Sequence, residues 1–234
     1  MADPLLSVEK LNAFYGDAQA LFDLDLTLAR GELLALIGAN GAGKSTLLKS
    51  ITGLVRNRRG TIRLEGTDLM ALPAHDIVGR GVALVPEGRR LFPSLSVEEN
   101  LMLGGKAGRR GHWSLETVYA LFPVLREKRR GPSTSLSGGQ QQMVAIGRGL
   151  MSNPDVLLLD ELSLGLAPVI IRDIYELLPK IAGNGLSVIL VEQDVNRALS
   201  VADRFMCMLE GKVKLEGRPD QFSRDEITNA YFGT

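Results

Sequence analysis

The chain has 234 residues, of which 45% are apolar, so it is long enough to bury a hydrophobic core and is typical of a globular protein. Lysine and arginine together number 27, as do aspartate and glutamate, and this balance excludes the overall basic charge that nucleic-acid-binding proteins usually carry. A local basic face is still compatible with it. The single cysteine, Cys207, excludes an internal disulfide and fits a reducing compartment; its apolar surroundings favour a small buried side chain over a reactive thiol.

The sequence carries no recognisable targeting or membrane-spanning segment. Its first residues, MADPLLSVEKL, contain acids and lack the basic start and apolar stretch of a signal peptide. No uninterrupted apolar stretch approaches the roughly 20 residues that a spanning helix needs. We therefore expect a chain that is soluble by itself and acts at a membrane only through a partner.

The first elements are expected to be short strands over residues 7–28, with a turn at Tyr15-Gly16-Asp17. Apolar and polar residues alternate loosely from 18 to 28, as in a half-buried strand. An apolar run over 33–37 then stops at Gly38, and a helix-compatible segment begins at Lys44. The order strand, glycine-rich loop, helix is the context that a phosphate-binding loop requires.

The loop fills the template G-x-x-x-x-G-K-[ST] with Gly38, Gly43, Lys44 and Ser45. Glycines let successive backbone N–H groups point at phosphate oxygens, and the start of the following helix favours an anion. Lys44 can reach the β- and γ-phosphates, and the Ser45 hydroxyl can bind Mg²⁺. The alternative is a chance match in a glycine-rich chain, against which the flanking strand and helix argue. The nucleotide-binding residues expected here are Gly38, Asn40, Gly41, Ala42, Gly43, Lys44, Ser45 and Thr46.

The next stretch changes in character along the chain. A hairpin is expected over 61–64 and 67–69, as part of a small antiparallel sheet, and a buried strand over 82–85. Residues 87–133 then contain more Arg, Gly and Pro. A capping box starting at Ser96 precedes a helix over 100–103, a flexible basic loop covers 104–111, and another helix is expected over 113–125. Basic residues 128–130 indicate a solvated face, with a partner-docking surface as the alternative.

The last third alternates buried strands with helices, which predicts a mostly parallel α/β sheet. Ser137 opens a helix that runs to about Met151. The later elements are a strand over 156–160, a helix from Pro168, a turn at 184–185, a strand over 186–191, a helix over 195–201, a hairpin over 205–209 and 213–215, and a helix over 225–231.

Two acids, Asp160 and Glu161, follow the apolar run at 156–159. Acids at the carboxyl end of a central strand lie where ligands of such folds bind. Asp160 is then placed to hold Mg²⁺ through water, and Glu161 to polarise a water that attacks the γ-phosphate. Acids also end strands merely for solubility, but the phosphate loop in the same chain favours the catalytic interpretation.

The string Leu136 to Gln140, LSGGQ, is a second helix start suited to an anion, or else an ordinary helix cap. Together with the phosphate loop and the acidic strand end, it resembles the ATP-binding cassette family over essentially the whole chain. The resemblance implies one cassette domain over 1–234, with a nucleotide-binding core and antiparallel β subdomain at 1–86 and 152–234 and a helical subdomain at 87–151. It further implies a head-to-tail dimer in which the signature of one subunit contacts the γ-phosphate held by the other subunit's Lys44. The signature residues concerned are Ser137, Gly138, Gly139 and Gln140.

Four further positions are read against the family pattern. Tyr15 matches the aromatic residue that the family stacks on adenine; the alternative is an ordinary turn residue. Glu87 stands where Gln is usual, and its carboxylate could approach Mg²⁺ but would repel the γ-phosphate. Gln193 stands where a switch His is usual; its amide can bind phosphate but does not titrate near neutrality. Leu162 replaces the usual Pro, and leucine fixes no φ. We still expect Lys44, Glu87, Glu161 and Gln193 in catalysis, and Ser45, Glu87 and Asp160 at the metal.

The strings VPEGRR, SLGLAP and LVEQ look like the ATPase subunits of branched-chain amino acid importers, particularly the second of their two paired ATPases. This implies ATP and Mg²⁺ as cofactors and a second ATPase subunit, either another copy or a companion. It also implies two membrane permease subunits, an indirect periplasmic binding protein, and a cytoplasmic position on the inner face of the membrane. The alternative is a soluble cassette-type module gated by ATP that acts on nucleic acid or ribosomes. Zero net charge, a single cassette and the lack of coiled-coil heptads argue against that module.

Overall fold

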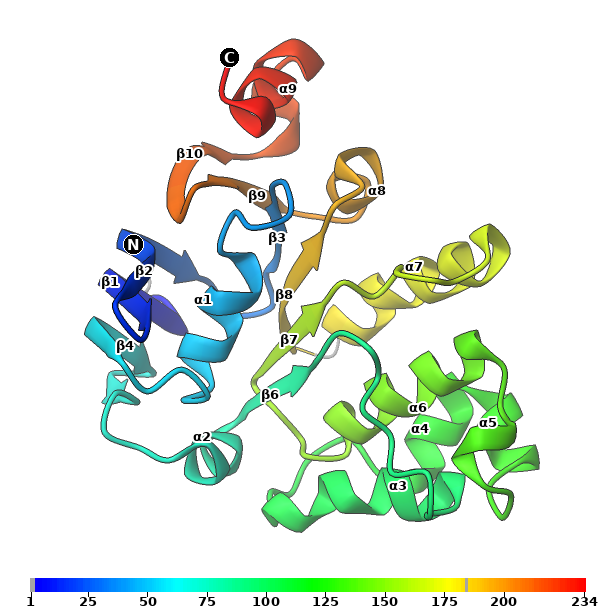
Figure 1. The fold of residues 1–234 in the computed structure, drawn as a ribbon. Coiled ribbons are helices and arrows are strands. Elements are labelled where there is room, and N and C mark those ends of the chain that lie inside the picture. Colours follow the sequence, from blue (N-terminus) through cyan, green and yellow to red (C-terminus); the bar gives the residue numbers. More distant parts are fainter. Residues whose placement is uncertain (1–2, 184) are drawn as a thin grey trace.

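A mostly parallel six-stranded sheet forms the centre of the computed structural model, which describes residues 3–183 and 185–234 (Figure 1). The strand order is β10-β9-β3-β8-β7-β6, and only the β9–β10 pair is antiparallel. The strands are β3 (Leu33–Ile37), β6 (Val82–Val85), β7 (Val156–Asp160), β8 (Ser187–Glu192), β9 (Arg204–Leu209) and β10 (Lys212–Gly217). Because β3, β7 and β8 are buried along their whole length, they read as nearly continuous apolar runs in the sequence.

A second, antiparallel sheet has the order β2-β1-β4-β5. Its strands are β1 (Leu6–Tyr15), β2 (Ala18–Leu28), β4 (Arg58–Leu64) and β5 (Thr67–Asp68). Buried leucines of β1 and β2 join α1 (Lys44–Ile51) and one face of the central sheet in a single apolar core. The predicted fold class, a mostly parallel sheet with a small antiparallel sheet and a helical part, is confirmed.

The helices cover both faces and one end of the central sheet. They are α1, α2 (Ala74–Arg80), α3 (Val97–Gly104), α4 (Leu115–Leu121), α5 (Pro123–Glu127), α6 (Gly138–Leu150), α7 (Pro168–Ala182), α8 (Val195–Leu199) and α9 (Arg224–Phe232). Helices α3 to α6 gather beyond β6, drawn in green in Figure 1, and share a second apolar core with α7 and the other face of the sheet. The 3₁₀ turns are Gly105–Ala107, Ser133–Ser135 and Pro219–Gln221.

The predicted helix caps at Ser96 and Ser137 are confirmed, although α3 begins at Val97, directly after its cap, and not at residue 100. Ser96 caps α3 and Ser137 caps α6, each accepting a hydrogen bond from the backbone N–H three residues later, while Glu99 and Gln140 return the contact. The reciprocal pair satisfies donors that the first helical turn leaves without intrahelical acceptors.

The single helix expected over 113–125 is wrong. Trp113 precedes the helical part, Ser114 caps α4, and α4 ends at Leu121. Phe122 lies between α4 and α5 with φ −128° and ψ 76°, and Pro123 begins α5. Proline disfavours a helical conformation at the preceding residue and has no N–H to donate, so the chain breaks there.

Other boundaries also differ from the expectation. The loop expected over 104–111 begins inside α3, and the last part of 195–201 lies beyond the end of α8. Helix α2 was not predicted, because it is short and Ile77 is its only fully buried residue. The turn expected at 184–185 falls partly outside the described residues.

Two further expectations can be compared with the described part of the chain. Across residues 3–183 and 185–234, no helix has the length and apolarity needed to cross a bilayer. Cys207 is a free, buried residue of β9, and burial raises the pKa of its thiol to about 11. A buried thiol with a raised pKa is poorly reactive, in agreement with the structural interpretation of this cysteine.

Candidate active site

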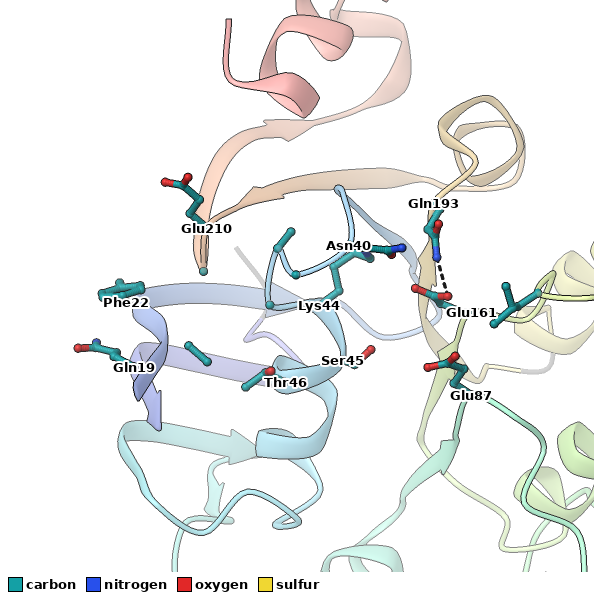
Figure 2. A pocket seen from close by; sticks show the side chains of 16 residues that line it. Gln19, Phe22, Asn40, Lys44, Ser45, Thr46, Glu87, Glu161, Gln193 and Glu210 are labelled. Atoms are coloured by element: carbon teal, nitrogen blue, oxygen red, sulfur yellow. Dashed lines mark hydrogen bonds between the residues drawn. The ribbon is translucent and has the colours of Figure 1, made fainter. Parts of the chain in front are cut away.

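A cleft of about 750 Å³ opens along the carboxyl ends of the central strands (Figure 2). The pairs Ile37–Glu192 and Val85–Leu159 lie opposite each other in the parallel ladders, so the residues that follow these strands meet at one edge. The cleft is lined by Gln19, Ala20, Phe22, Asn40, Gly41, Ala42, Gly43, Lys44, Ser45, Thr46, Glu87, Glu161, Leu164, Gln193, Glu210 and Gly211.

The phosphate-loop glycines are required by the shape of the backbone. Gly43 has φ 98°, in the left-handed region, at the start of α1. Gly38 has φ 151°, and a Cβ atom there would lie 2.3 Å from the carbonyl oxygen of Met208 in β9. A side chain at either position would therefore displace the loop from its place between β3 and α1.

Lys44 is held inside the loop that it completes. Its Nζ donates to the carbonyl oxygens of Gly38 at 2.6 Å and Ala39 at 3.0 Å, and the residue is only 4% exposed. Burial lowers the pKa of Lys44, while the negative charges of Glu161 and Asp160 oppose that change. The ammonium group is thus held by two loop carbonyl oxygens in a residue that lines the cleft.

Ser45 and Asp160 bring two oxygen donors together where α1 meets β7. The Ser45 hydroxyl donates to Oδ1 of Asp160 at 2.9 Å. Burial raises the pKa of Asp160, and the hydrogen bond from Ser45 opposes this. Among the described residues, no cluster of three or more His, Cys, Asp or Glu side chains could hold a metal ion. A hydroxyl and one carboxylate fit Mg²⁺, which is usually bound by few protein ligands together with substrate phosphates.

Glu161 lies directly opposite the phosphate loop. Its φ is 49°, and its N–H donates to the carbonyl oxygen of Val191 at 3.0 Å, so β8 holds it in this uncommon conformation. The Gln193 amide donates to the Glu161 carboxylate at 2.7 Å, as Figure 2 shows. Glu87, which follows β6, lines the same wall of the cleft.

Tyr15 lies beside the cleft. Its hydroxyl is 3.5 Å from Oγ1 of the cleft-lining Thr46, and its side chain is half exposed, but Tyr15 itself does not line the cleft. Sequence reasoning missed Phe22, Gln19 and Glu210, which close the cleft on the side of β2 and the β9–β10 turn. The local signal that could have pointed to this wall was Phe22, a large aromatic residue left exposed on β2.

The signature residues at the start of α6 do not line this cleft. Ser137 is exposed and Gly139 is buried. A Cβ atom on Gly139 would lie 2.3 Å from Cγ2 of Ile170, so this glycine permits close packing of α6 against α7. Within the described part of one chain, the phosphate loop and the signature therefore belong to separate surfaces.

Comparisons with known proteins agree with this geometry. The family model for ABC transporters matches residues 21–163. A high-affinity branched-chain amino acid transport ATP-binding protein, BraG of Pseudomonas aeruginosa, is 44% identical over 98% of this chain and 100% of its own length.

Solved structures of ATP-binding cassettes are also similar to this chain. An ATP-binding subunit of an ABC transporter is similar with a TM-score of 0.83 and 31% identity, covering 97% of this chain and 99% of that one. A dimeric cassette in a post-hydrolysis state, bound to ADP and phosphate, has a TM-score of 0.80 and 26% identity, covering 91% of this chain and 98% of that one. The cleft, its phosphate loop and these likenesses together place the chain in the ABC transporter family, among its ATP-binding subunits.

Proposed function

We propose that the chain hydrolyses ATP to power the import of a small solute, branched-chain or other hydrophobic amino acids, through partner permease subunits. The observation that carries this proposal is that Lys44, Glu161 and Gln193 line one cleft, while the buried Asp160 is hydrogen-bonded to Ser45 in its wall. Lys44 supplies a positive charge for the phosphates, and Asp160 supplies a carboxylate for the metal ion. Glu161 is the base, and the Gln193 amide orients it.

Each residue has a defined task in this reaction. The loop N–H groups and Lys44 bind the phosphates, and Ser45 and Asp160, with Glu87 beside them, would hold Mg²⁺. When bound, Mg²⁺ neutralises phosphate charge and orients the phosphate oxygens. The Glu161 carboxylate polarises the attacking water and accepts its proton, while Gln193 orients that carboxylate. Tyr15 stacks on the adenine ring from the side of Thr46.

The working unit in this proposal is a head-to-tail pair of ATPase subunits. Because the signature lies away from the chain's own cleft, a second subunit is needed to bring Ser137 and the N–H groups of the α6 start to the γ-phosphate. The dimeric cassette bound to ADP and phosphate supports such an assembly. The second subunit is either another copy or a companion ATPase.

The solute and the remaining partners follow from the likeness to the transport protein of Pseudomonas aeruginosa. We infer two membrane permease subunits, a periplasmic binding protein that acts indirectly, and a position on the inner face of the cytoplasmic membrane. The division into a core at 1–86 and 152–234 and a helical subdomain at 87–151 also stays a prediction. The relatives reported above act in transport, which does not favour the alternative of a nucleic-acid or ribosome module.

Copurification distinguishes the transport function from the nucleic-acid or ribosome function. We expect the tagged chain, expressed with its chromosomal neighbours, to retain a companion ATPase and apolar permease subunits, and to release phosphate from ATP. Retention of nucleic acid that is lost as salt rises, without any membrane subunit, would support the module instead.

A further inference from the structure

Glu192 is a buried acid to which the proposed reaction assigns no role. It is the last residue of β8, it is 1% exposed, and it does not line the cleft. None of the ion pairs among the described residues includes it. A buried carboxylate without a paired cation must be stabilised by hydrogen-bond donors.

Those donors come from Ser163, two residues after Glu161. The Ser163 N–H donates to Oε1 of Glu192 at 3.1 Å, and the Ser163 hydroxyl donates to Oε2 at 2.7 Å. Both oxygens of the carboxylate are therefore bound by one residue of the loop that follows β7. If this loop moved, the buried carboxylate would lose both hydrogen-bond donors at once. The position of the loop is therefore strongly coupled to Glu192.

The same end of β8 holds Glu161 at two other points. The carbonyl oxygen of Val191 accepts from the N–H of Glu161, and Gln193 donates to its carboxylate. Three consecutive residues, the last two of β8 and Gln193 directly after it, thus bind Glu161 and Ser163. Leu162, between them, is buried but fixes no φ, so contacts rather than a proline ring must set the path of this loop.

We propose that Glu192 is a positioning residue for ATP hydrolysis: its carboxylate clamps Ser163 and so fixes Glu161 and the cleft-lining Leu164. The inference rests on the proposed function, because it assigns Glu161 as the base. An error of about 1 Å in the placement of a reacting group can reduce turnover by about 100-fold. The clamp is therefore expected to act mainly on kcat, because its two hydrogen bonds go to Ser163 and not to the phosphate loop, although the charge of Glu192 also acts on Lys44.

The Tyr175 side chain lies close to Glu192. Burial raises the pKa of Tyr175, and the negative charge of Glu192 adds to this shift. The Tyr175 hydroxyl is buried and interacts with the Glu192 carboxylate. Because Tyr175→Phe would alter this contact, the matched control is the conservative replacement Ser163→Thr.

The test compares kcat and the dissociation constant of ATP in the wild type, Glu192→Gln, Ser163→Ala, Ser163→Thr and the double variant Glu192→Gln/Ser163→Ala. We expect Glu192→Gln and Ser163→Ala each to lose about tenfold or more in kcat, with the dissociation constant of ATP changed less than about threefold. Threonine keeps the hydroxyl, so Ser163→Thr should stay within about threefold of the wild type. The double variant Glu192→Gln/Ser163→Ala should lose no more kcat than the more impaired single variant, because both changes break the same pair of hydrogen bonds.

Several outcomes would overturn the inference. These are unchanged kcat in Ser163→Ala, an equal loss in Ser163→Thr, or losses that multiply in the double variant. Ser163 is half-buried, so its variants decide the matter even if Glu192→Gln fails to fold. A folded wild type that does not hydrolyse ATP with its partners would instead refute the proposed function.

Discussion

The side-chain amide of Gln193 donates a hydrogen bond of 2.7 Å to the carboxylate of Glu161 (Figure 2). The amide has no proton to gain or lose near neutral pH, so it orients the carboxylate equally well across that range. The proposed base therefore has a partner that does not titrate, where an imidazole would make its orientation depend on pH.

Replacing Glu161 with Gln tests the base directly. The change keeps the shape of the side chain but removes its ability to accept a proton, so turnover should fall by roughly 100-fold or more while ATP binding is retained. Steady-state phosphate release and equilibrium nucleotide binding measure the two effects. The matched control is Glu176→Gln on α7, an exposed carboxylate, which should behave as the wild type. Unchanged turnover in Glu161→Gln would remove Glu161 from the role of base.

The two histidines should not contribute to the pH dependence of turnover. The His75 side chain is 82% exposed beside Asp76, and the His112 ring packs edge-on against Trp113 at 4.9 Å. Replacing both with Asn should leave the pH profile of kcat unchanged, whereas Gln193→His should add a titration near about pH 6.5. Stopped assays of phosphate release between about pH 6 and 8 measure both. Loss of a neutral-pH limb in the double His variant would contradict this assignment.

The ionised side chain of Asp160 should lower the free energy of unfolding at neutral pH. Because burial raises its pKa in the folded chain above the unfolded value, the folded state favours the protonated form. The ionised form is therefore disfavoured by folding at high pH, and this penalty disappears as the pH falls through the raised pKa. Asp160→Asn should accordingly stabilise the nucleotide-free chain at pH 7, with a gain that shrinks in acid.

Urea unfolding of the two proteins at several pH values measures this difference. Asp155→Asn is the contrasting variant, since Asp155 pairs with Arg109 at 2.5 Å and its replacement should destabilise the chain at pH 7. A stability gain of Asp160→Asn that grows toward acid pH would show that the sign of the argument is wrong.

The two signature glycines should differ in their structural importance. A methyl group on Gly139 would meet Ile170 at 2.3 Å, so Gly139→Ala should cost about 1–3 kcal/mol of unfolding free energy. At Gly138 the nearest atom is the flexible tip of Arg89 at 3.2 Å, and the higher helix propensity of alanine can offset the contact. Chemical denaturation of both variants provides the comparison. Equal losses would mean that α6 and α7 adjust to the added methyl group.

Much of the nucleotide cleft could be predicted from the sequence, because its central part is contiguous. The apolar run of β3, the glycines after it and the start of α1 at Lys44 are local properties of the backbone and of burial. The caps at Ser96 and Ser137 are equally local. The break before Pro123 has a local signal too, yet the apolar pattern around it concealed the break.

Tertiary structure alone decided which distant residues meet. Strand order brings Gln193 after β8 to Glu161 after β7, and it sets Glu192 against Ser163, because neighbouring parallel strands end at one edge of the sheet. It also brings the turn at Glu210 to the cleft and keeps the signature away from it. The sequence by itself determined the loop, the apolar strands and the helix caps, since these depend on neighbours along the chain. Contacts across long separations depend on how whole elements pack, and the pattern of one strand does not report the strand beside it.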